Sequence, residues 1–169
     1  MPIVSSDIKL YLSGGTGNSD KNASLGGGIS TAEIVDNSVN NLFAFAVASE
    51  AEAGSTKYRA FFVKNTHATL TYTSSKIYIS SNTSSPTTSV SVALADEAVG
   101  VSTIETIADE NTAPVGPIFS TADGISNAIT IGDIAPGEMK GIWVKWVINA
   151  STEAITDEMT FTFKGETLA

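Results

Sequence analysis

The sequence has 169 residues and no cysteine, and its 18 carboxylates and nine basic side chains give a net charge of −9. This length suffices for one domain with a proper core, and the missing cysteines exclude disulfides, thiolate chemistry and zinc sites built on cysteine. The few basic residues form no basic patch, which argues against binding nucleic acid or an anionic membrane. We also expect no secretory signal and no membrane span, because neither apolar pattern is present.

The N-terminal part is predicted to contain one strand, a long loop and a segment that the pattern does not resolve. Ile8, Leu10 and Leu12 alternate with polar neighbours, which predicts a first strand. Six glycines lie within residues 13–30, where regular structure would carry a large entropic cost, so we expect an extended loop. Residues 31–41 suit either a capped helical turn or an irregular strand.

Residues 57–79 carry the strongest strand signal and contain the only arginine and the only histidine. Both faces of 58–64 are largely apolar, with Phe61 and Val63 on one face and Phe62 on the other, which predicts a central strand. We expect a hairpin turn at 65–68 to return the chain as an adjacent strand.

The second half is predicted to form strands at 90–94, 141–148 and 159–164, where apolar and polar residues alternate. Residues 96–116 are expected to be a loop, and 118–131 to contain short strands. In the strand 141–148 the two tryptophans point to opposite faces. We expect Trp146 in the core, with Trp143 on the other face as an interface candidate.

Short strands separated by turn signals predict an all-β protein with one antiparallel β-sandwich over 1–169. We expect a jelly-roll or immunoglobulin-like arrangement with Greek-key connections. Residues 1–30 are expected to form an N-terminal strand followed by an extended, glycine-rich arm.

The sequence shows no catalytic set, and we expect no enzyme activity, no cofactor and no metal. No GxSxG elbow accompanies His67, which suits a turn or an interface. The carboxylate pairs lie side by side on loops and not across a predicted cleft. Residues 18–22 lack the calcium-loop spacing, and neither glycine cluster is followed by the GK[ST] of a phosphate loop.

Four stretches nevertheless carry a resemblance: residues 1–30, 58–71 (YRAFFVKNTHATLT), 108–120 (ADENTAPVGPIFS) and 134–146 (IAPGEMKGIWVKW). Together they resemble small structural proteins of tailed-bacteriophage virions. That resemblance implies a β-sandwich protein of the virion, assembled in the host cytoplasm, whose role is contact with other subunits.

The leading hypothesis is a capsid decoration or cement protein that contacts the major capsid protein and further copies of itself. A neck, tail or fibre-base component is the alternative, and a carbohydrate-binding module with a tryptophan platform is a third possibility. The candidate interface residues lie in the predicted arm, in the hairpin turn and on the second major strand: Gly14, Gly15, Asn18, Leu25, Gly27, His67 and Trp143.

Overall fold

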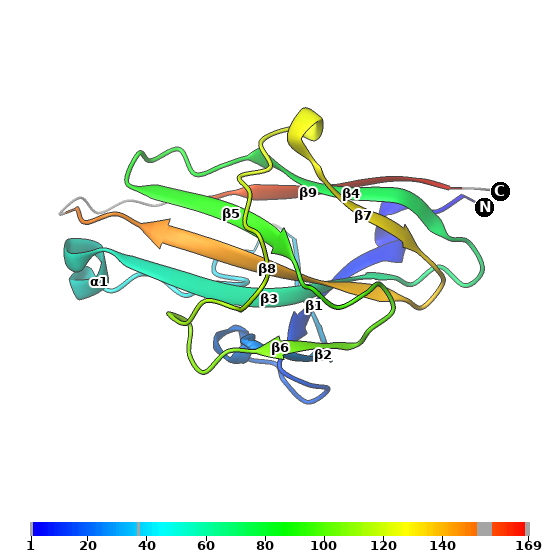
Figure 1. Cartoon of the computed structure of the whole chain (residues 1–169), viewed down its shortest axis with the longest axis horizontal. Coiled ribbons are helices and arrows are strands. Elements are labelled where there is room, and N and C mark those ends of the chain that lie inside the picture. The colour runs from blue at the N-terminus through cyan, green and yellow to red at the C-terminus, as the bar shows by residue number, and fades with distance from the viewer. Residues whose placement is uncertain (1, 37, 152–156, 168–169) are drawn as a thin grey trace.

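The computed structural model describes residues 2–36, 38–151 and 157–167, and most of the regular secondary structure within them is β-strand (Figure 1). The elements in chain order are η1 (Ser5–Asp7), β1 (Ile8–Ser13), η2 (Lys21–Ala23), β2 (Gly26–Glu33), α1 (Ala48–Ala53), β3 (Ser55–Asn65), β4 (Tyr72–Ser81), β5 (Thr88–Leu94), β6 (Thr103–Thr106), η3 (Ile125–Asn127), β7 (Ile129–Ile134), β8 (Met139–Ile148) and β9 (Thr160–Thr167), where η marks a 3-10 turn.

The strands form two antiparallel sheets that pack as a β-sandwich, as the sequence predicts. Sheet A has six strands in the order β5-β8-β3-β1-β2-β6, and sheet B has three in the order β7-β4-β9. Figure 1 shows sheet B above the β5-β8-β3 part of sheet A, while β2 and β6 curl away below. Within the described residues, no helix is long and apolar enough to cross a membrane.

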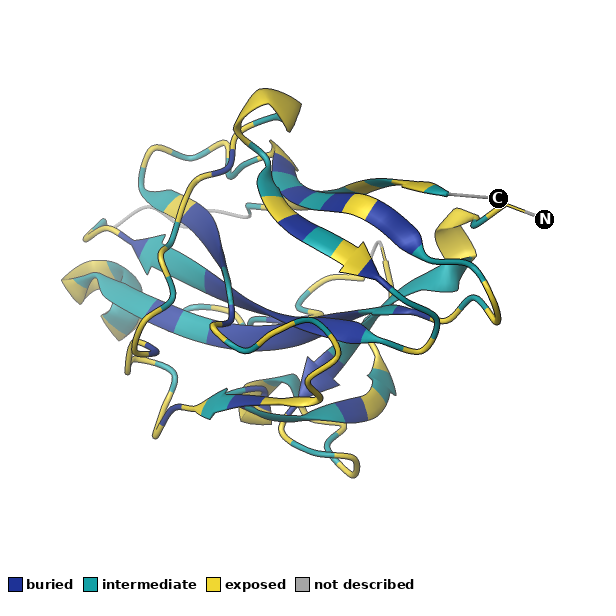
Figure 2. Ribbon diagram, turned by 45° about the vertical axis from the view of Figure 1, so that its right-hand side comes forward, coloured by how far each residue is buried: buried dark blue, intermediate teal, exposed yellow. Residues whose placement is uncertain are grey.

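Strands β3 and β8 are both interior strands of sheet A, which confirms the prediction that β3 is an interior strand. The two strands pair without a register shift from Ser55↔Ile148 to Lys64↔Met139. Both have neighbours on either side, and Figure 2 shows them as the most continuously buried strands. A strand covered on both faces must be apolar on both, and the sequence of β3 meets that requirement.

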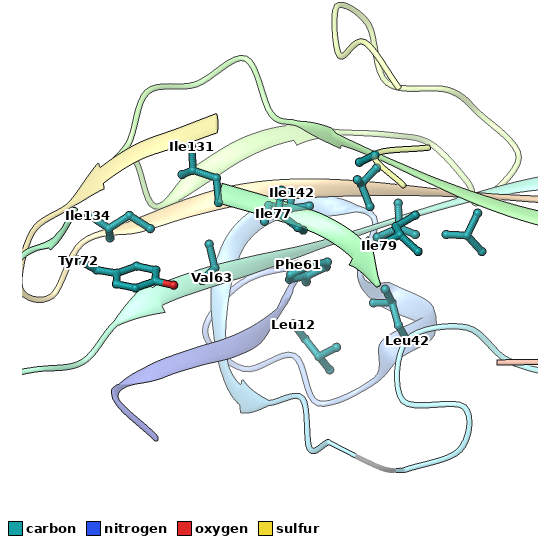
Figure 3. Close-up of a cluster of buried hydrophobic side chains, with 14 residues drawn as sticks. Leu12, Leu42, Phe61, Val63, Tyr72, Ile77, Ile79, Ile131, Ile134 and Ile142 are labelled. Atoms are coloured by element: carbon teal, nitrogen blue, oxygen red, sulfur yellow. The ribbon is translucent and has the colours of Figure 1, made fainter. Parts of the chain in front are cut away.

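The main core lies between the two sheets (Figure 3). Phe61 of β3 is 1% exposed, and its ring lies 5.9 Å from the ring of Phe161 and 6.4 Å from that of Phe163, both on β9. Burial of such a side chain stabilises the fold by about 1.5–3 kcal/mol. The buried members of this core are Leu12, Leu42, Phe61, Val63, Tyr72, Ile77, Ile79, Val90, Val92, Ala122, Ile131, Ile134, Ile142 and Val144.

A second core lies on the opposite face of sheet A, under the curled end. Phe62 and Trp143 are both 0% exposed there, and Ile104 and Ile107 cover them from β6 and the residue after it. The sequence pattern predicted a loop around Ile104 and Ile107, and the strand β6 was not predicted. This second layer explains why both faces of β3 are apolar.

The glycine-rich segment 13–30 contains the predicted loop, over residues 14–25, but its last part is strand and the loop does not extend as an arm. The Gly15 N–H donates to the carbonyl oxygen of Gly28, and Gly26 begins β2, which pairs with both β1 and β6. Gly26 has φ +91°, and a Cβ there would collide with the carbonyl oxygen of Glu105. Glycine therefore permits strand pairing at this position by allowing two backbones to approach closely.

The predicted hairpin between β3 and β4 is also wrong, because the two strands belong to different sheets. Both edges of β3 are already occupied, by β8 on one side and by β1 on the other. The buried Asn65 holds the crossover: its Nδ2 donates to the carbonyl oxygens of Leu70 (2.8 Å) and Ile134 (2.9 Å). The segment after β3 thus passes from sheet A to sheet B.

Candidate functional site

A cluster of two cations and two carboxylates, which we call the charge quartet, lies at the start of β3. The Nζ of Lys57 is 2.8 Å from both carboxylate oxygens of Glu50 and 3.1 Å from Oε1 of Glu110. The guanidinium of Arg59 pairs with the other oxygen of Glu110. Lys57 and Arg59 are 4% and 2% exposed, so the two cations are neutralised inside the protein.

The quartet residues come from α1, β3 and the segment 108–112. The segment can approach β3 because β1 leaves the first part of that strand unpaired. β1 pairs with β3 only from Phe61 onwards. Beside the earlier residues of β3 lies the 108–112 segment, whose Glu110 carbonyl accepts from the Tyr58 N–H at 2.6 Å. The residues of α1, mostly alanine and glutamate, favour a short helix that brings Glu50 to the other side of Lys57.

The Glu50 carboxylate has a second structural role. Its Oε2 accepts a hydrogen bond from the Val47 N–H at 3.0 Å, at the first turn of α1. Burial raises the pKa of Glu50, but the hydrogen bonds from Lys57 and Val47 and the charge of Lys57 together lower it below its ordinary value. Glu50 is therefore ionised at neutral pH and ties α1 to β3.

The loop 35–47 lies next to the quartet, where Phe43 contacts Trp146 and Arg59. The ring of Phe43 lies edge-on to Trp146, with 5.4 Å between centroids, and the Arg59 guanidinium lies 5.8 Å from the Phe43 centroid. Leu42 is 6% exposed and belongs to the main core. We call residues 35–47 the contact loop; residue 37 lies outside the described part of the chain.

The contact loop presents large apolar side chains to solvent. Nine such side chains are exposed in the described part of the chain, and four of them lie in this one loop. Phe45 is 73% exposed and Val39 86%, with Val35 and Val47 beside them in sequence. This loop therefore holds more of the exposed large apolar side chains than any other segment of the described chain.

The core contacts and the ion pair on either side of this apolar surface preorganise it. In the sequence, Phe45 and Val47 lie between the buried Leu42 and the partly buried Phe43 on one side and Glu50, which pairs with Lys57, on the other. A loop that is already held in place loses less conformational entropy when it binds. The geometry suits contact with another protein.

A third buried cation, Lys140, has a structural role. Its Nζ donates to the carbonyl oxygens of Ala95 (2.7 Å) and Glu97. Burial lowers its pKa, and the charges of Glu97 and Asp96 oppose that shift. Lys140 holds the turn after β5 in place.

Among the described residues, no three His, Asp or Glu side chains are arranged to hold a metal ion.

The candidate interface residues from the predicted arm make their contacts within the protein itself. Gly14 and Gly15 have positive φ and lie in the turn after β1. The Asn18 side chain donates to the carbonyl oxygen of Ser13 and accepts from the Asp20 N–H. Leu25 packs against the second core, and Gly27 pairs with Ile104.

His67 lies in the crossover, where its ring organises local backbone. The Nδ1 accepts hydrogen bonds from the N–H groups of Thr69 (3.2 Å) and Leu70 (3.0 Å). The ring therefore carries no proton on Nδ1 in this arrangement. The structure does not bring His67 together with the other candidates.

Trp143 is buried, so its assignment to an interface is corrected. The second core covers it, and that layer was not visible in the strand pattern. Trp146 packs against Phe43 in the main core. The buried Trp143 offers no stacking surface for the carbohydrate-binding alternative, and Trp146 is partly buried against the core.

Neither the quartet nor the contact loop was predicted as functional from the sequence. A signal for the loop was available: residues 42–48 are continuously apolar, with alanine after each of the two phenylalanines, and they precede charged residues. The sequence does not reveal which of these side chains face outward. Glu110 could not be paired with Arg59 because 51 residues separate them.

Comparison with known proteins gives no match: no family model, curated protein or solved structure matches this chain.

Proposed function

We propose that this chain is a structural subunit of a tailed-phage virion, and specifically a capsid decoration or cement protein. In this role it binds neighbouring major capsid subunits and further copies of itself, and its surface apolar residues become buried on assembly. The resemblance of its sequence segments to virion proteins motivates the proposal, and the β-sandwich fold is compatible with it.

The observation that carries the proposal is the contact loop. Phe45 is 73% exposed on a loop that is fixed at both ends, although the rest of the sandwich buries its phenylalanines at least in part. An exposed aromatic side chain on a preorganised loop is suited to act as an anchor in a partner's pocket. The main alternative is a neck, tail or fibre-base component, which would use the same surface.

The test is to purify particles of the virus that encodes the chain and to measure the protein by quantitative mass spectrometry. A copy number comparable to that of the major capsid protein is expected for decoration. A copy number that is a small fraction of it would place the protein at the neck or tail instead. Its absence from purified particles would contradict the proposal.

A further inference from the structure

A second surface, on the outer face of sheet B, complements the contact loop. Lys76 of β4 and Lys164 of β9 lie directly opposite each other in the strand ladder. They line a shallow pocket of about 180 Å³ whose other walls are Ser74, Ile125, Gly165 and Glu166. We call this surface the lysine face.

The two lysines have no ion pair within the described part of the chain, where the ion pairs use Lys9, Lys57 and Arg59. Like charges directly opposite in an antiparallel pair destabilise the sheet. The chain has twice as many carboxylates as cations, so partners within the fold were available. The lysine face therefore favours binding of acidic groups, and the nearby carboxylates Glu166, in the pocket wall, and Asp133, which accepts from the Ser74 N–H, form no ion pair with either lysine.

The lysine face also has an apolar component, because Ile125 is 46% exposed beside the pocket. It therefore combines positive charge with an apolar wall. This combination matches a partner surface that is apolar and acidic.

The contact loop and the start of α1 have that character. From residue 34 to residue 56 the sequence contains no lysine or arginine, and its charged residues are Asp36, Glu50 and Glu52. Glu50 is held in the quartet, while Asp36 and Glu52 are exposed. The exposed Phe45 and Val47 lie between these two carboxylates in the sequence.

The charges also indicate the symmetry of a self-contact. A two-fold contact of the contact loop with itself would bring carboxylates together, which costs free energy. Figure 1 shows α1, which follows the contact loop, at one end of the molecule and β4 and β9 in its upper layer. Contact between two different surfaces is heterologous and generates a ring or an open array.

We propose that the contact loop of one copy docks on the lysine face of a second copy. Phe45 and Val47 would pack near Ile125, and Asp36 and Glu52 would face Lys76 and Lys164. This inference rests on the proposed function and specifies the self-contact within the assembly.

The test uses analytical ultracentrifugation of the purified chain over a range of concentrations and salt. The wild type is expected to self-associate, and more weakly as salt screens the charges. Phe45→Asp alone, or Lys76→Glu with Lys164→Glu, is expected to weaken association by about tenfold or more. Ile118→Asp is the matched control, since Ile118 is 87% exposed on another loop, and association should be unchanged.

Charge reversal on both surfaces gives the sharpest result. A variant with Asp36→Lys and Glu52→Lys should also associate weakly, and combining these changes with Lys76→Glu and Lys164→Glu should restore association. Circular dichroism verifies that each variant is folded. A monomeric wild type at all concentrations, or association that the lysine substitutions leave unchanged, would overturn the inference.

These outcomes are separable from those of the particle experiment. If the protein is found in virions but is monomeric when pure, only the self-contact is refuted. If it self-associates as described but is absent from virions, only the virion role is refuted.

Discussion

Phe61 and Phe62 are neighbours on β3, yet they stabilise two different cores. Phe61 packs between the sheets, whereas Phe62 packs under the curled end of sheet A. A polar residue at either position would therefore enter an apolar layer. At the residue scale, β3 is the part of the chain least able to accept substitution.

Phe61→Ala is expected to lower the free energy of unfolding by about 3–5 kcal/mol, because the side chain is 1% exposed and its removal leaves a cavity. Urea unfolding measures this loss. His67→Ala is the contrasting variant. It removes one acceptor of two backbone hydrogen bonds at a half-buried position, with an expected loss of about 1 kcal/mol. Equal losses in the two variants would contradict this account of the core.

Arg59→Met tests the charge quartet. Glu110 would keep only Lys57 as a partner, and we expect a loss near the lower end of the 3–5 kcal/mol that breaking a buried pair costs. The lower end applies because the Glu110 side chain is 28% exposed. Lys9→Met breaks the exposed pair with Glu33 and should leave stability unchanged within error. A neutral Arg59→Met would show that the quartet does not hold the loops.

At the element scale, the strands whose residues alternate or whose two faces are both apolar were predictable. These are β1, β3, β5, β8 and β9, and each lies where the pattern placed it. β2 and β6 were not predictable, because β2 begins with three glycines and β6 has only four residues. Their pairing depends on backbone approach and not on side-chain periodicity.

Gly26→Ala tests that explanation. The added methyl group would collide with the Glu105 carbonyl and would occupy a backbone conformation with positive φ. We expect a loss of about 2 kcal/mol or more in urea unfolding. Gly17→Ala is the control, since nothing lies within 4 Å of the added atom, and it should be neutral. Similar effects of the two substitutions would argue against a tight β2–β6 contact.

The candidate site depends on contacts that the sequence does not encode locally. Trp143 and Trp146 were assigned to opposite faces correctly, but a strand pattern does not show that a second layer covers Trp143. Similarly, the sequence shows that the contact loop is apolar, but only the structure shows that Leu42 is buried and Phe43 packs on the core while Phe45 is exposed. The site therefore required the tertiary structure.

At the scale of the whole molecule, carboxylates tie separate segments together. Asp157 accepts hydrogen bonds from the N–H groups of Ser84 and Ser85 and from the Thr88 hydroxyl, which joins the chain before β9 to the loop before β5. Burial raises the pKa of Asp157, but these hydrogen bonds outweigh it and lower the pKa. Glu50 behaves in the same way beside Lys57.

These shifts predict acid sensitivity. A carboxyl group with a lower pKa in the folded state holds fewer protons there, so it stabilises the fold above its ordinary pKa, and that stabilisation is lost as the pH falls through the folded value. The ordinary values are 4.5 for Glu50 and 3.8 for Asp157. The Tm should therefore be constant near neutral pH, and it should decrease as the pH is lowered below about 4.5. Glu50→Gln together with Asp157→Asn should flatten this dependence, and an unchanged slope would contradict the assignment.

The central claim is that the contact loop is an assembly surface. A cryo-electron microscopy reconstruction of purified particles of the encoding virus tests it most directly. The account predicts that density for this β-sandwich lies on the particle, with Phe45 and Val47 buried against a neighbouring subunit. A reconstruction in which the sandwich is present but the contact loop faces solvent, or in which the sandwich is absent, would contradict it.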